Sequence, residues 1–561
     1  MNELRIRCHQ LNTIVGQFRK NADKILHSLE QAERDGIDLL VLPELTVCGY
    51  PPLDLLEHKT FIDACLNVTH EIIQASGSTA LLFGSIWKNP SQHGRALFNA
   101  AILAEHGKLQ AVRFKTLLPT YDIFDELRYF EPASENTPVL WRKTLLGVTI
   151  CEDIWTLDTQ NTYVNYAIDP VHTLVEQGAQ LLINLSASPY TRNKAEIRRE
   201  LLSKQAKKHQ VPIAYCNLCG SNTEVIFDGD SMFVNPSGEL IGQASLFDEG
   251  WVDAHYDRQT LTPLKQTING IPRTEERTFR ALMSGIRDYF TKSGIPPKVV
   301  LGLSGGIDSA LVAVLAAEAI GPDQVVGLLM PSPYSSQGSI DDSLTLANNL
   351  GISTHTLAIH EIFGSFQQTL EPAFVGLSSD VTEENLQSRI RGTLLMAYSN
   401  KFGHLLLNTG NKSELAVGYC TLYGDMNGAL SVLADLYKTE VYLLSQWLNS
   451  HYFMREVIPT RILEKAPSAE LSPGQKDSDS LPEYDVLDSI LIKLIEQQHS
   501  VHEIVEIGYE AQIVHKVYSL LMKSEFKRKQ APPGLRLSAK AFGMGRRIPL
   551  VHGWNETDLN H

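Results

Sequence analysis

A glycine-rich hexapeptide in the second half of the chain has the residue types needed to hold a phosphate group. Residues 304–309, SGGIDS, follow the apolar run 299–303 and precede a long helical pattern. In such a turn the glycines let the backbone approach an anion closely, while the free N–H groups and the dipole of the helix attract it. The pattern is neither G-x-x-x-x-G-K-[ST] nor G-x-G-x-x-G. It therefore predicts a phosphate site of another kind.

A C-x-x-C pair, Cys216 and Cys219, could do redox or metal chemistry. No second C-x-x-C or histidine pair lies at zinc-finger spacing, and the pair ends an apolar run, VPIAYCNLCG, instead of opening a helix as redox pairs do. We expect both cysteines to be packing residues, with a redox role as the alternative.

The first part of the chain alternates apolar β-runs with amphipathic segments, a pattern typical of an α/β layered domain. The runs include DLLVLPELTVCGY, TALLFGSIW, LLGVTICEDIW and AQLLINLSASPY, and NKAEIRRELLSKQAKKHQ is a helical pattern between two of them. We place this domain at residues 1–251.

Residues 252–274 are polar, carry two prolines and show no sustained period, which predicts a linker. After it, PPKVVLGLSGGIDSALVAVLAAEAIG reads as strand, turn and helix, and VVGLLMPSP as a second strand. This βαβ unit predicts a doubly wound parallel sheet in a second domain, residues 275–561.

Composition excludes several classes of protein. The 561 residues carry 49 Lys and Arg against 64 Asp and Glu, a net charge of −15, which disfavours nucleic-acid binding. We find no apolar run near the ~20 residues that span a bilayer, and the opening MNELRIRCHQ lacks the apolar region of a signal peptide. Seven cysteines, an odd number, suit a reducing compartment, so we expect a cytoplasmic protein without membrane or nucleic-acid partners.

The full SGGIDS string resembles the pyrophosphate-binding loop of the N-type ATP pyrophosphatases, which split ATP into AMP and pyrophosphate. Further strings resemble, in order and spacing, the motifs of the NAD synthetase family: ENLQSRIRGTLLMAYSN, NTGNKSELAVGYCTLYGDMNGAL, LADLYKTEVYLL and PSAELSPGQKDSDSLPEYDVLD. The resemblance implies a domain that binds ATP and deamido-NAD.

The same resemblance implies roles for individual residues. It places ATP at Gly302, Leu303, Ser304, Gly305, Gly306, Ile307, Asp308, Ser309 and Thr409. It makes Asp308 and Glu414 magnesium ligands, as hard carboxylate oxygens beside ATP phosphates would suit Mg²⁺. It places deamido-NAD at Asn385, Arg389, Glu414, Asp425, Lys438 and Lys527. Basic residues gather near the end of the chain in FKRKQ and GMGRRIP, for which a solvated basic tail is the alternative to a substrate contact by Lys527.

Three strings of the first domain resemble the nitrilase superfamily, which implies an α-β-β-α sandwich and a cysteine amidase. They are VLPELTVCGYPPLDLL with Glu44, RFKTLLPTYDIFDELRYF with Lys115, and VTICEDIW with Cys151. A thiol needs a base to become a nucleophile, which Glu44 can be, and the tetrahedral oxyanion needs a cation, which Lys115 supplies. A cysteine that closes an apolar strand is otherwise most often an inert core residue.

Glutamine-binding positions follow from the same resemblance. They are Tyr121, Glu126, Ser188 and Lys194, with Lys194 on the substrate α-carboxylate and Glu126 positioning Lys115 and the substrate. An ordinary loop carboxylate is the alternative for Glu126.

The order of amidase and synthetase resembles that of the bacterial glutamine-dependent NAD synthetases. This implies a ligase that hydrolyses glutamine and passes ammonia to ATP-adenylated deamido-NAD, with ATP as substrate, Mg²⁺ as cofactor and a homo-oligomeric assembly. Two alternatives remain: another glutamine-dependent amidating ATP pyrophosphatase with a different acceptor, and a catalytically dead nitrogen or nucleotide sensor.

Overall fold

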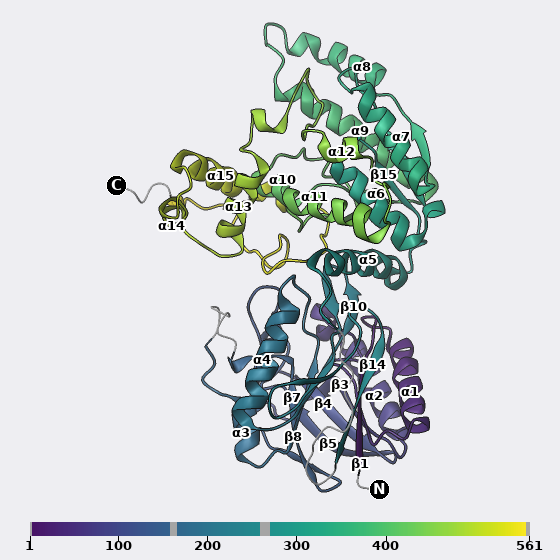
Figure 1. The fold of residues 1–561 in the computed structure, drawn as a ribbon, viewed down its shortest axis with the longest axis vertical. Coiled ribbons are helices and arrows are strands. Elements are labelled where there is room, and N and C mark those ends of the chain that lie inside the picture. Colours follow the sequence, from purple (N-terminus) through teal and green to yellow (C-terminus); the bar gives the residue numbers. More distant parts are fainter. Residues whose placement is uncertain (1–2, 158–164, 258–269, 557–561) are drawn as a thin grey trace. The chain divides into compact units, whose positions relative to one another are not determined.

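The chain forms two compact units, Met1–Pro272 and Arg273–His561 (Figure 1). The structure, a computed structural model, describes residues 3–157, 165–257 and 270–556. Each unit has its own sheets and its own core, so each is described by itself.

The first unit is built on two six-stranded sheets. One has the order β14-β1-β2-β3-β4-β5 and the other β13-β12-β9-β8-β7-β6. The strands of the first sheet are β1 (Glu3–Gln10), β2 (Leu39–Val41), β3 (Ala80–Lys88), β4 (Leu97–Glu105), β5 (Lys108–Phe114) and β14 (Gly250–Asp257). Those of the second are β6 (Val139–Trp141), β7 (Thr144–Ile150), β8 (Leu181–Ser186), β9 (Ile213–Asn217), β12 (Met232–Val234) and β13 (Leu240–Gln243). The hairpin β10 (Cys219–Asn222) and β11 (Val225–Asp228) stands apart.

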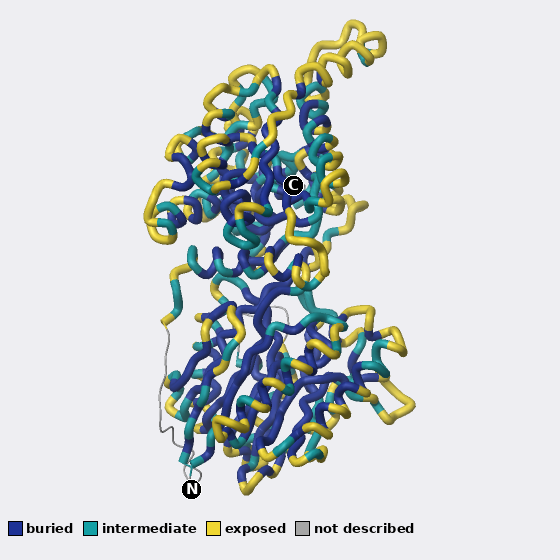
Figure 2. Tube along the Cα trace, turned by 90° about the vertical axis from the view of Figure 1, so that its right-hand side faces the viewer, coloured by how far each residue is buried: buried dark blue, intermediate teal, exposed yellow. Residues whose placement is uncertain are grey.

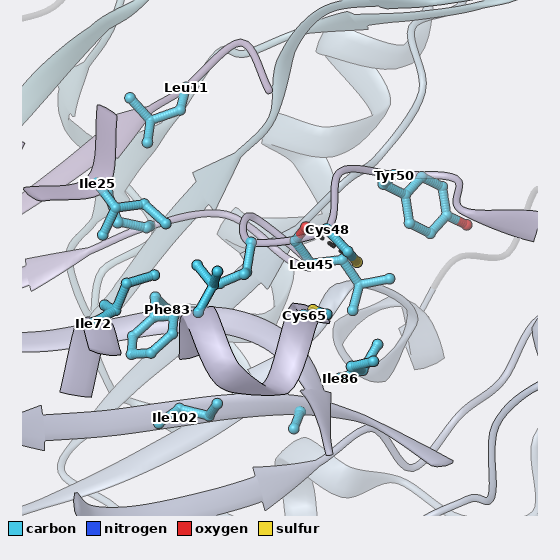
Figure 3. Packing of buried hydrophobic residues seen from close by; sticks show 14 of the residues in the cluster. Leu11, Ile25, Leu45, Cys48, Tyr50, Cys65, Ile72, Phe83, Ile86 and Ile102 are labelled. Carbon is cyan, nitrogen blue, oxygen red and sulfur yellow. Dashed lines mark hydrogen bonds between the residues drawn. The ribbon is translucent and has the colours of Figure 1, made fainter. Parts of the chain in front are cut away.

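Helices cover the outer face of each sheet of this unit. They are α1 (Phe18–Arg34), α2 (Lys59–Gln74), α3 (Pro170–Glu176) and α4 (Lys194–His209). Side chains alternate along β3 because successive residues of a strand point to opposite faces. Phe83 packs in the helix-covered core with Ile72 of α2 and Ile102 of β4 (Figure 3), whereas Leu82 belongs to a separate core with residues of the other sheet. The predicted α-β-β-α sandwich is confirmed.

The strand ends of the sandwich carry the residues that the sequence singled out. Glu44 follows β2, Lys115 follows β5, Cys151 follows β7 and Ser188 follows β8. β1, β2 and β3 pair in parallel, β4 is antiparallel to β3 and to β5, and β7, β8 and β9 pair in parallel. The residue-bearing strands β2 and β5 therefore end at one edge of the first sheet, and β7 and β8 end at one edge of the second.

The linker begins later in the chain than the sequence predicts. Residues 250–257 form β14, which pairs antiparallel with the whole of β1 from Glu3 to Gln10. Residues 252–257 are thus an edge strand of the first sheet, and residues 258–269 lie outside the described part. The second unit's first helix, α5 (Thr274–Ser293), starts at the last position of the expected linker.

The second unit holds a five-stranded sheet of order β17-β16-β15-β18-β19, in which every pairing is parallel. Its strands are β15 (Val299–Gly302), β16 (Val325–Leu329), β17 (Ser353–Thr356), β18 (Leu405–Asn408) and β19 (Leu430–Ser431). The first strand in sequence, β15, lies between β16 and β18, so the strand order reverses there. In doubly wound sheets ligands bind at such a switch point, and the SGGIDS loop follows β15.

Helices lie on both faces of this sheet. On one face α8 and α9 pack against the strands through the core of Val300, Leu328, Phe363 and Ile390. On the other, α5, α6 and α11 pack together. The helices of the unit after α5 are α6 (Ile307–Ile320), α7 (Gln337–Leu350), α8 (His360–Leu370), α9 (Val381–Phe402), α10 (Lys412–Val417), α11 (Lys438–Trp447), α12 (Thr460–Glu464), α13 (Tyr484–Ile495), α14 (Val501–Glu506), α15 (Ala511–Lys523) and α16 (Glu525–Arg528). The predicted doubly wound parallel sheet is confirmed.

Burial follows these layers. In Figure 2 the interior strands of the first unit are mostly dark blue, and exposed segments lie at loops and outer helix faces. In the second unit α6 is buried on nearly all sides, from Ile307 to Ala317 with one exception, because it is enclosed by the sheet and by neighbouring helices. No helix among the described residues is both long and apolar enough to cross a membrane.

Candidate active sites

A buried lysine joins two carboxylates in the first unit. The Nζ of Lys115 donates hydrogen bonds to Glu44 and to Glu126, each at 2.8 Å. The side chains of Lys115 and Glu44 have no exposed surface, and that of Glu126 is 6% exposed. Two of the three ammonium protons are thus engaged, and the third is left for a ligand.

Glu44 is fixed by groups from two further strands. Its Oε1 also accepts a hydrogen bond from Asn99 Nδ2 of β4 at 2.7 Å, and its Oε2 accepts one from the Ala187 N–H, directly after β8, at 2.9 Å. The Tyr50 hydroxyl donates to Glu126 at 2.9 Å. Every carboxylate of this cluster is therefore hydrogen-bonded, as buried charges must be.

Electrostatics keep the Cys151 thiol protonated until a base acts on it. Burial raises the pKa of Cys151 well above its usual value, the Glu44 carboxylate raises it further, and the Lys115 ammonium opposes both. Burial also raises the pKa of Glu126 to about 7, against the Lys115 charge. Burial alone would lower the pKa of Lys115, but Glu126 and Glu44 together raise it well above the ordinary range. The arrangement is a thiol, a base and a fixed cation in mutual range, which is what amide hydrolysis by cysteine requires.

The predicted glutamine contacts lie around the short 3₁₀ helix η3 (Cys151–Leu157). The hydroxyl of Tyr121 donates to the Glu152 carboxylate at 2.9 Å, as does that of Tyr166 at 2.8 Å. The Lys194 Nζ lies 3.6 Å from the centre of the Trp155 ring. Ser188 is buried, and its N–H donates to Asn217 Oδ1 at 2.8 Å.

The phosphate loop of the second unit requires glycine at one position. Gly305 has φ +75, and a Cβ there would lie 2.5 Å from the Ser339 carbonyl oxygen, so only glycine fits. Gly306 is the N-cap of α6 in an extended conformation, which points the first N–H groups of the helix at the loop. The predicted strand, turn and helix are all present.

Two carboxylates from separate helices meet one lysine beside this loop. Lys438 Nζ donates to Asp308 Oδ2 at 2.5 Å and to Glu414 Oε1 at 3.5 Å. Asn411 Nδ2 donates to Asp308 Oδ1 at 3.0 Å, and Asn411 and Glu414 form the capping box of α10. Burial and the like charge of Asp308 raise the pKa of Glu414 to about 8, although Lys438 opposes the shift. The two carboxylates are thus close enough to repel each other, as a pair that shares a cation would be.

A cavity of about 280 Å³ encloses the loop and this pair. Its lining includes every predicted ATP contact, residues 302–309 and Thr409, together with Glu414, Asp425 and Lys438. Within the described residues no cluster of three or more Asp, Glu, His or Cys is arranged to hold a metal ion.

The other three residues predicted to bind deamido-NAD do not line that cavity, but their side chains all bond to one loop. Asn385 of α9 accepts a hydrogen bond from the Thr421 hydroxyl at 2.8 Å, and Arg389 Nε donates to the Leu422 carbonyl at 3.3 Å. Lys527 Nζ donates to the carbonyls of Gly418 and Cys420, each at 2.7 Å. All three side chains therefore converge on residues 418–422, just before the cavity-lining Asp425.

The C-terminal basic cluster is not simply solvated. Arg528 and Arg546 are buried and share the carboxylate of Glu525. Arg528 also donates to the carbonyls of Leu415 and Ala416 at the end of α10. The solvated-tail interpretation is wrong for these two arginines, because both are buried and paired with Glu525, and Arg528 also binds the end of the helix that carries Glu414.

The sequence argument missed several residues at both sites. Arg391 and Lys465 line the cavity of the second unit. In the first unit Asn99 binds Glu44, and Glu152 binds Tyr121. Asn99 carried a signal, since it is a polar residue inside the apolar strand LFNAAILAE. The pair Cys216 and Cys219 is buried, as expected for packing residues.

Comparisons with known proteins match both units. The carbon-nitrogen hydrolase family matches residues 5–266, and the NAD synthase family matches residues 278–531. A glutamine-dependent NAD(+) synthetase from Synechocystis sp. is 46% identical over 97% of this chain and 98% of its own length. One from Thermotoga maritima is 42% identical over 99% of this chain and 100% of its own length.

A solved structure resembles the whole chain. The glutamine-dependent NAD+ synthetase from Acinetobacter baumannii in complex with adenosine diphosphate has a TM-score of 0.78 and 37% sequence identity, and the match covers 99% of both chains.

Proposed function

Because the chain belongs to the glutamine-dependent NAD(+) synthetase family, we propose how its two sites divide the reaction of that family. The protein is a ligase that makes NAD from deamido-NAD with glutamine as nitrogen donor and ATP as energy source. The first unit, Met1–Pro272, hydrolyses glutamine. The second, Arg273–His561, adenylates and amidates deamido-NAD.

In the first unit Cys151 is the nucleophile. Glu44 takes the thiol proton, and the thiolate attacks the side-chain amide carbon of glutamine, forming a tetrahedral oxyanion. The third N–H of Lys115 donates to this oxyanion, since the other two are held by Glu44 and Glu126. Glu44 returns its proton to the leaving nitrogen, ammonia departs, and water then hydrolyses the thioester to give glutamate.

Glutamine is selected by charge at its α-carbon. Lys194 binds the α-carboxylate, and the Glu152 carboxylate, aligned by the hydroxyls of Tyr121 and Tyr166, accepts the α-ammonium. Ser188 contacts the substrate from the end of β8, and Glu126 orients Lys115.

In the second unit ATP binds with its phosphates on residues 304–309 and Thr409. Asp308 and Glu414 would hold Mg²⁺, which would neutralise phosphate charge there. The nicotinate carboxylate of deamido-NAD attacks the α-phosphorus of ATP, and pyrophosphate leaves along the N-terminus of α6. Ammonia then attacks the acyl carbon and displaces AMP.

Deamido-NAD lies between the cavity and the loop 418–422. Asn385, Arg389 and Lys527 reach it from the loop side, and Asp425 and Lys438 reach its reacting end from the cavity. Arg391 and Lys465 meet phosphate charge in the cavity.

Two properties of the whole enzyme are part of the proposal. It is a homo-oligomer formed through the second unit, and it acts in the cytoplasm. Light scattering coupled to gel filtration tests the first: a fully active species of 62.4 kDa, the single-chain mass, would rule out an obligate oligomer.

The observation that carries the division of labour is the Glu44, Lys115 and Cys151 cluster in one unit and the phosphate loop with its carboxylate pair in the other. The test is NAD formation from deamido-NAD, ATP and Mg²⁺ with either glutamine or ammonium. Both donors should support synthesis, with AMP and pyrophosphate formed in equal amounts. ATP consumption with glutamine but without deamido-NAD would favour a different acceptor, and no turnover at all would favour a sensor.

A further inference from the structure

A buried aspartate ties the nucleophile's strand to the backbone that carries the lysine. Asp153 is 2% exposed and lies two residues after Cys151. Its Oδ1 accepts hydrogen bonds from the N–H groups of Thr116 at 3.0 Å and Leu117 at 2.8 Å. Its Oδ2 accepts one from the N–H of Ile150 at 2.9 Å. One carboxylate thus bridges two segments that are 36 residues apart.

On one side this bridge acts on the residue before the nucleophile. Cys151 has φ +44, a conformation that non-glycine residues adopt rarely and that the surroundings must hold in place. The N–H of Ile150 is held by Asp153, and the Cys151 carbonyl accepts a weak bond from Asn184 Nδ2 at 3.4 Å. The turn that aims the thiol is therefore fixed from both ends.

On the other side the bridge acts directly after the lysine. The Lys115 N–H donates to the Asn99 carbonyl at 2.9 Å, and the Lys115 carbonyl accepts from the Ala133 N–H at 2.9 Å. The next two N–H groups along the chain, those of Thr116 and Leu117, donate to Asp153. Hydrogen bonds therefore fix the Lys115 backbone at its N–H, at its carbonyl and at the two residues that follow it. Asp153 links this segment to the turn at Cys151.

We propose that Asp153 is a positioning residue of the glutaminase reaction, which sets the distance between the Cys151 thiol and the Lys115 ammonium. It does so by binding the backbone N–H group directly before the cysteine, at Ile150, and the two directly after the lysine, at Thr116 and Leu117. The proposal rests on the proposed roles of Cys151 and Lys115. Asp153 does not touch glutamine. Its effect should thus fall on the step in which the thiol attacks and the oxyanion forms, and not on substrate binding.

The first test is Asp153→Asn, which keeps the size of the side chain but replaces one accepting oxygen with an NH₂ group facing a backbone N–H. A displacement of the order of 1 Å in an active site costs about 100-fold in rate. We therefore expect the glutaminase kcat to fall about 100-fold with the glutamine KM within about threefold of wild type. Ammonium-dependent NAD synthesis should be unchanged.

Asp153→Glu provides the conservative rescue. It retains a carboxylate that accepts two sets of N–H groups, at a changed length, so we expect a kcat loss of about fivefold. If the Asn variant does not fold, the Glu variant decides alone: a fall of that size with unchanged glutamine KM and melting temperature supports the proposal, and an unchanged kcat overturns it.

Asp38→Asn is the matched control in the same unit. Its carboxylate also accepts a backbone N–H, that of Arg5 at 3.0 Å, and pairs with Arg142, but neither partner belongs to the glutaminase cluster. It should lower the melting temperature without changing the glutaminase kcat.

Two results for Asp153 would overturn the proposal. One is an Asn variant with wild-type kcat. The other is a set of Asn and Glu variants that lose stability and raise KM together without separating in kcat, which indicates a structural role. Cys151→Ala assayed in parallel separates this failure from a failure of the proposed function, because it retains glutamine-dependent synthesis only if the nucleophile itself is misassigned.

Discussion

The two sites of this protein hold charge in opposite ways. In the first unit the side chains of Lys115 and Glu44 have no exposed surface, and their partners are other side chains and backbone groups of the protein. In the second unit Asp308 and Glu414 are 16% and 19% exposed and line a cavity. The glutaminase cluster is complete before its small substrate arrives, which preorganises it for an oxyanion. The ATP site leaves charge to be balanced by its ligands.

Removing the nucleophile separates the two sites most sharply. We expect Cys151→Ala to lose glutamine-dependent synthesis by about 10⁴-fold or more, because no other group forms the thioester. Ammonium-dependent synthesis should stay within about twofold of wild type, since the second unit is intact. Initial rates of NAD formation with each donor measure both. Normal synthesis from glutamine would mean that the nucleophile is misassigned.

Removing a carboxylate from the second site should affect both donors. Asp308→Asn and Glu414→Gln each weaken charge stabilisation of the departing pyrophosphate, so we expect losses of about 10² to 10³-fold with glutamine and with ammonium alike. Glutamate release, measured without deamido-NAD, should persist. Wild-type ammonium-dependent rates in either variant would contradict the metal role.

A single methyl group tests the shape of the phosphate loop. Gly305→Ala places a Cβ against the Ser339 backbone at a residue with φ +75, so we expect kcat/KM for ATP to fall about 100-fold. Gly294→Ala is the control: it has φ +68 at the end of α5 but nothing within 4 Å of its Cβ. It should cost about 1 kcal/mol of stability and leave the ATP kinetics unchanged.

The pH dependence of glutaminase activity tests the buried charged cluster of the first unit. Burial raises the pKa of Glu126 to about 7 and that of Asp153 to about 7. A carboxyl with a raised pKa is charged above that pH and neutral below it. As the pH falls through 7, protonation of Glu126 removes a charged partner of Lys115. Protonation of Asp153 weakens its hydrogen bonds to the backbone N–H groups. Because two groups titrate together, we expect glutaminase activity to fall more than about tenfold per pH unit below 7.

Glu126→Gln is the control for that profile. It removes one of the two titrations, so the steepness below pH 7 should drop to about tenfold per unit, on a lower maximum. A variant with the wild-type slope would exclude Glu126 from the acid limb.

A site formed by one short stretch of sequence could be predicted, whereas hydrogen bonds between residues far apart in the sequence could not. The SGGIDS loop was predictable because strand, glycine turn and helix start lie within one short stretch. The groups that hold Glu44 are 55 and 143 residues away, at Asn99 and Ala187, and no local pattern pairs them.

One error and one omission have identifiable physical causes. In β14 the buried residues Val252, Ala254 and Tyr256 alternate with polar ones, a period of two that polar composition concealed. On α9 the resemblance implied Arg389, which stays a prediction, and it did not include Arg391, which lines the cavity. Two residues along a helix point about 200° apart, so the two arginines serve different faces.

The pairing of β1 with β14 sets when the first unit can fold during synthesis. Among the described strands of this unit, the first in sequence, Glu3–Gln10, is flanked by β2 and by the last, Gly250–Asp257. Closing a loop of this length costs about 5 kcal/mol of chain entropy, and the contact cannot form until residue 257 has left the ribosome. At about 5–20 residues per second, β1 keeps one unpaired edge for more than ten seconds after it is made. The sheet that carries Glu44 and Lys115 is therefore completed late, when β14 pairs with β1. The nascent chain exposes an unpaired strand edge throughout that interval.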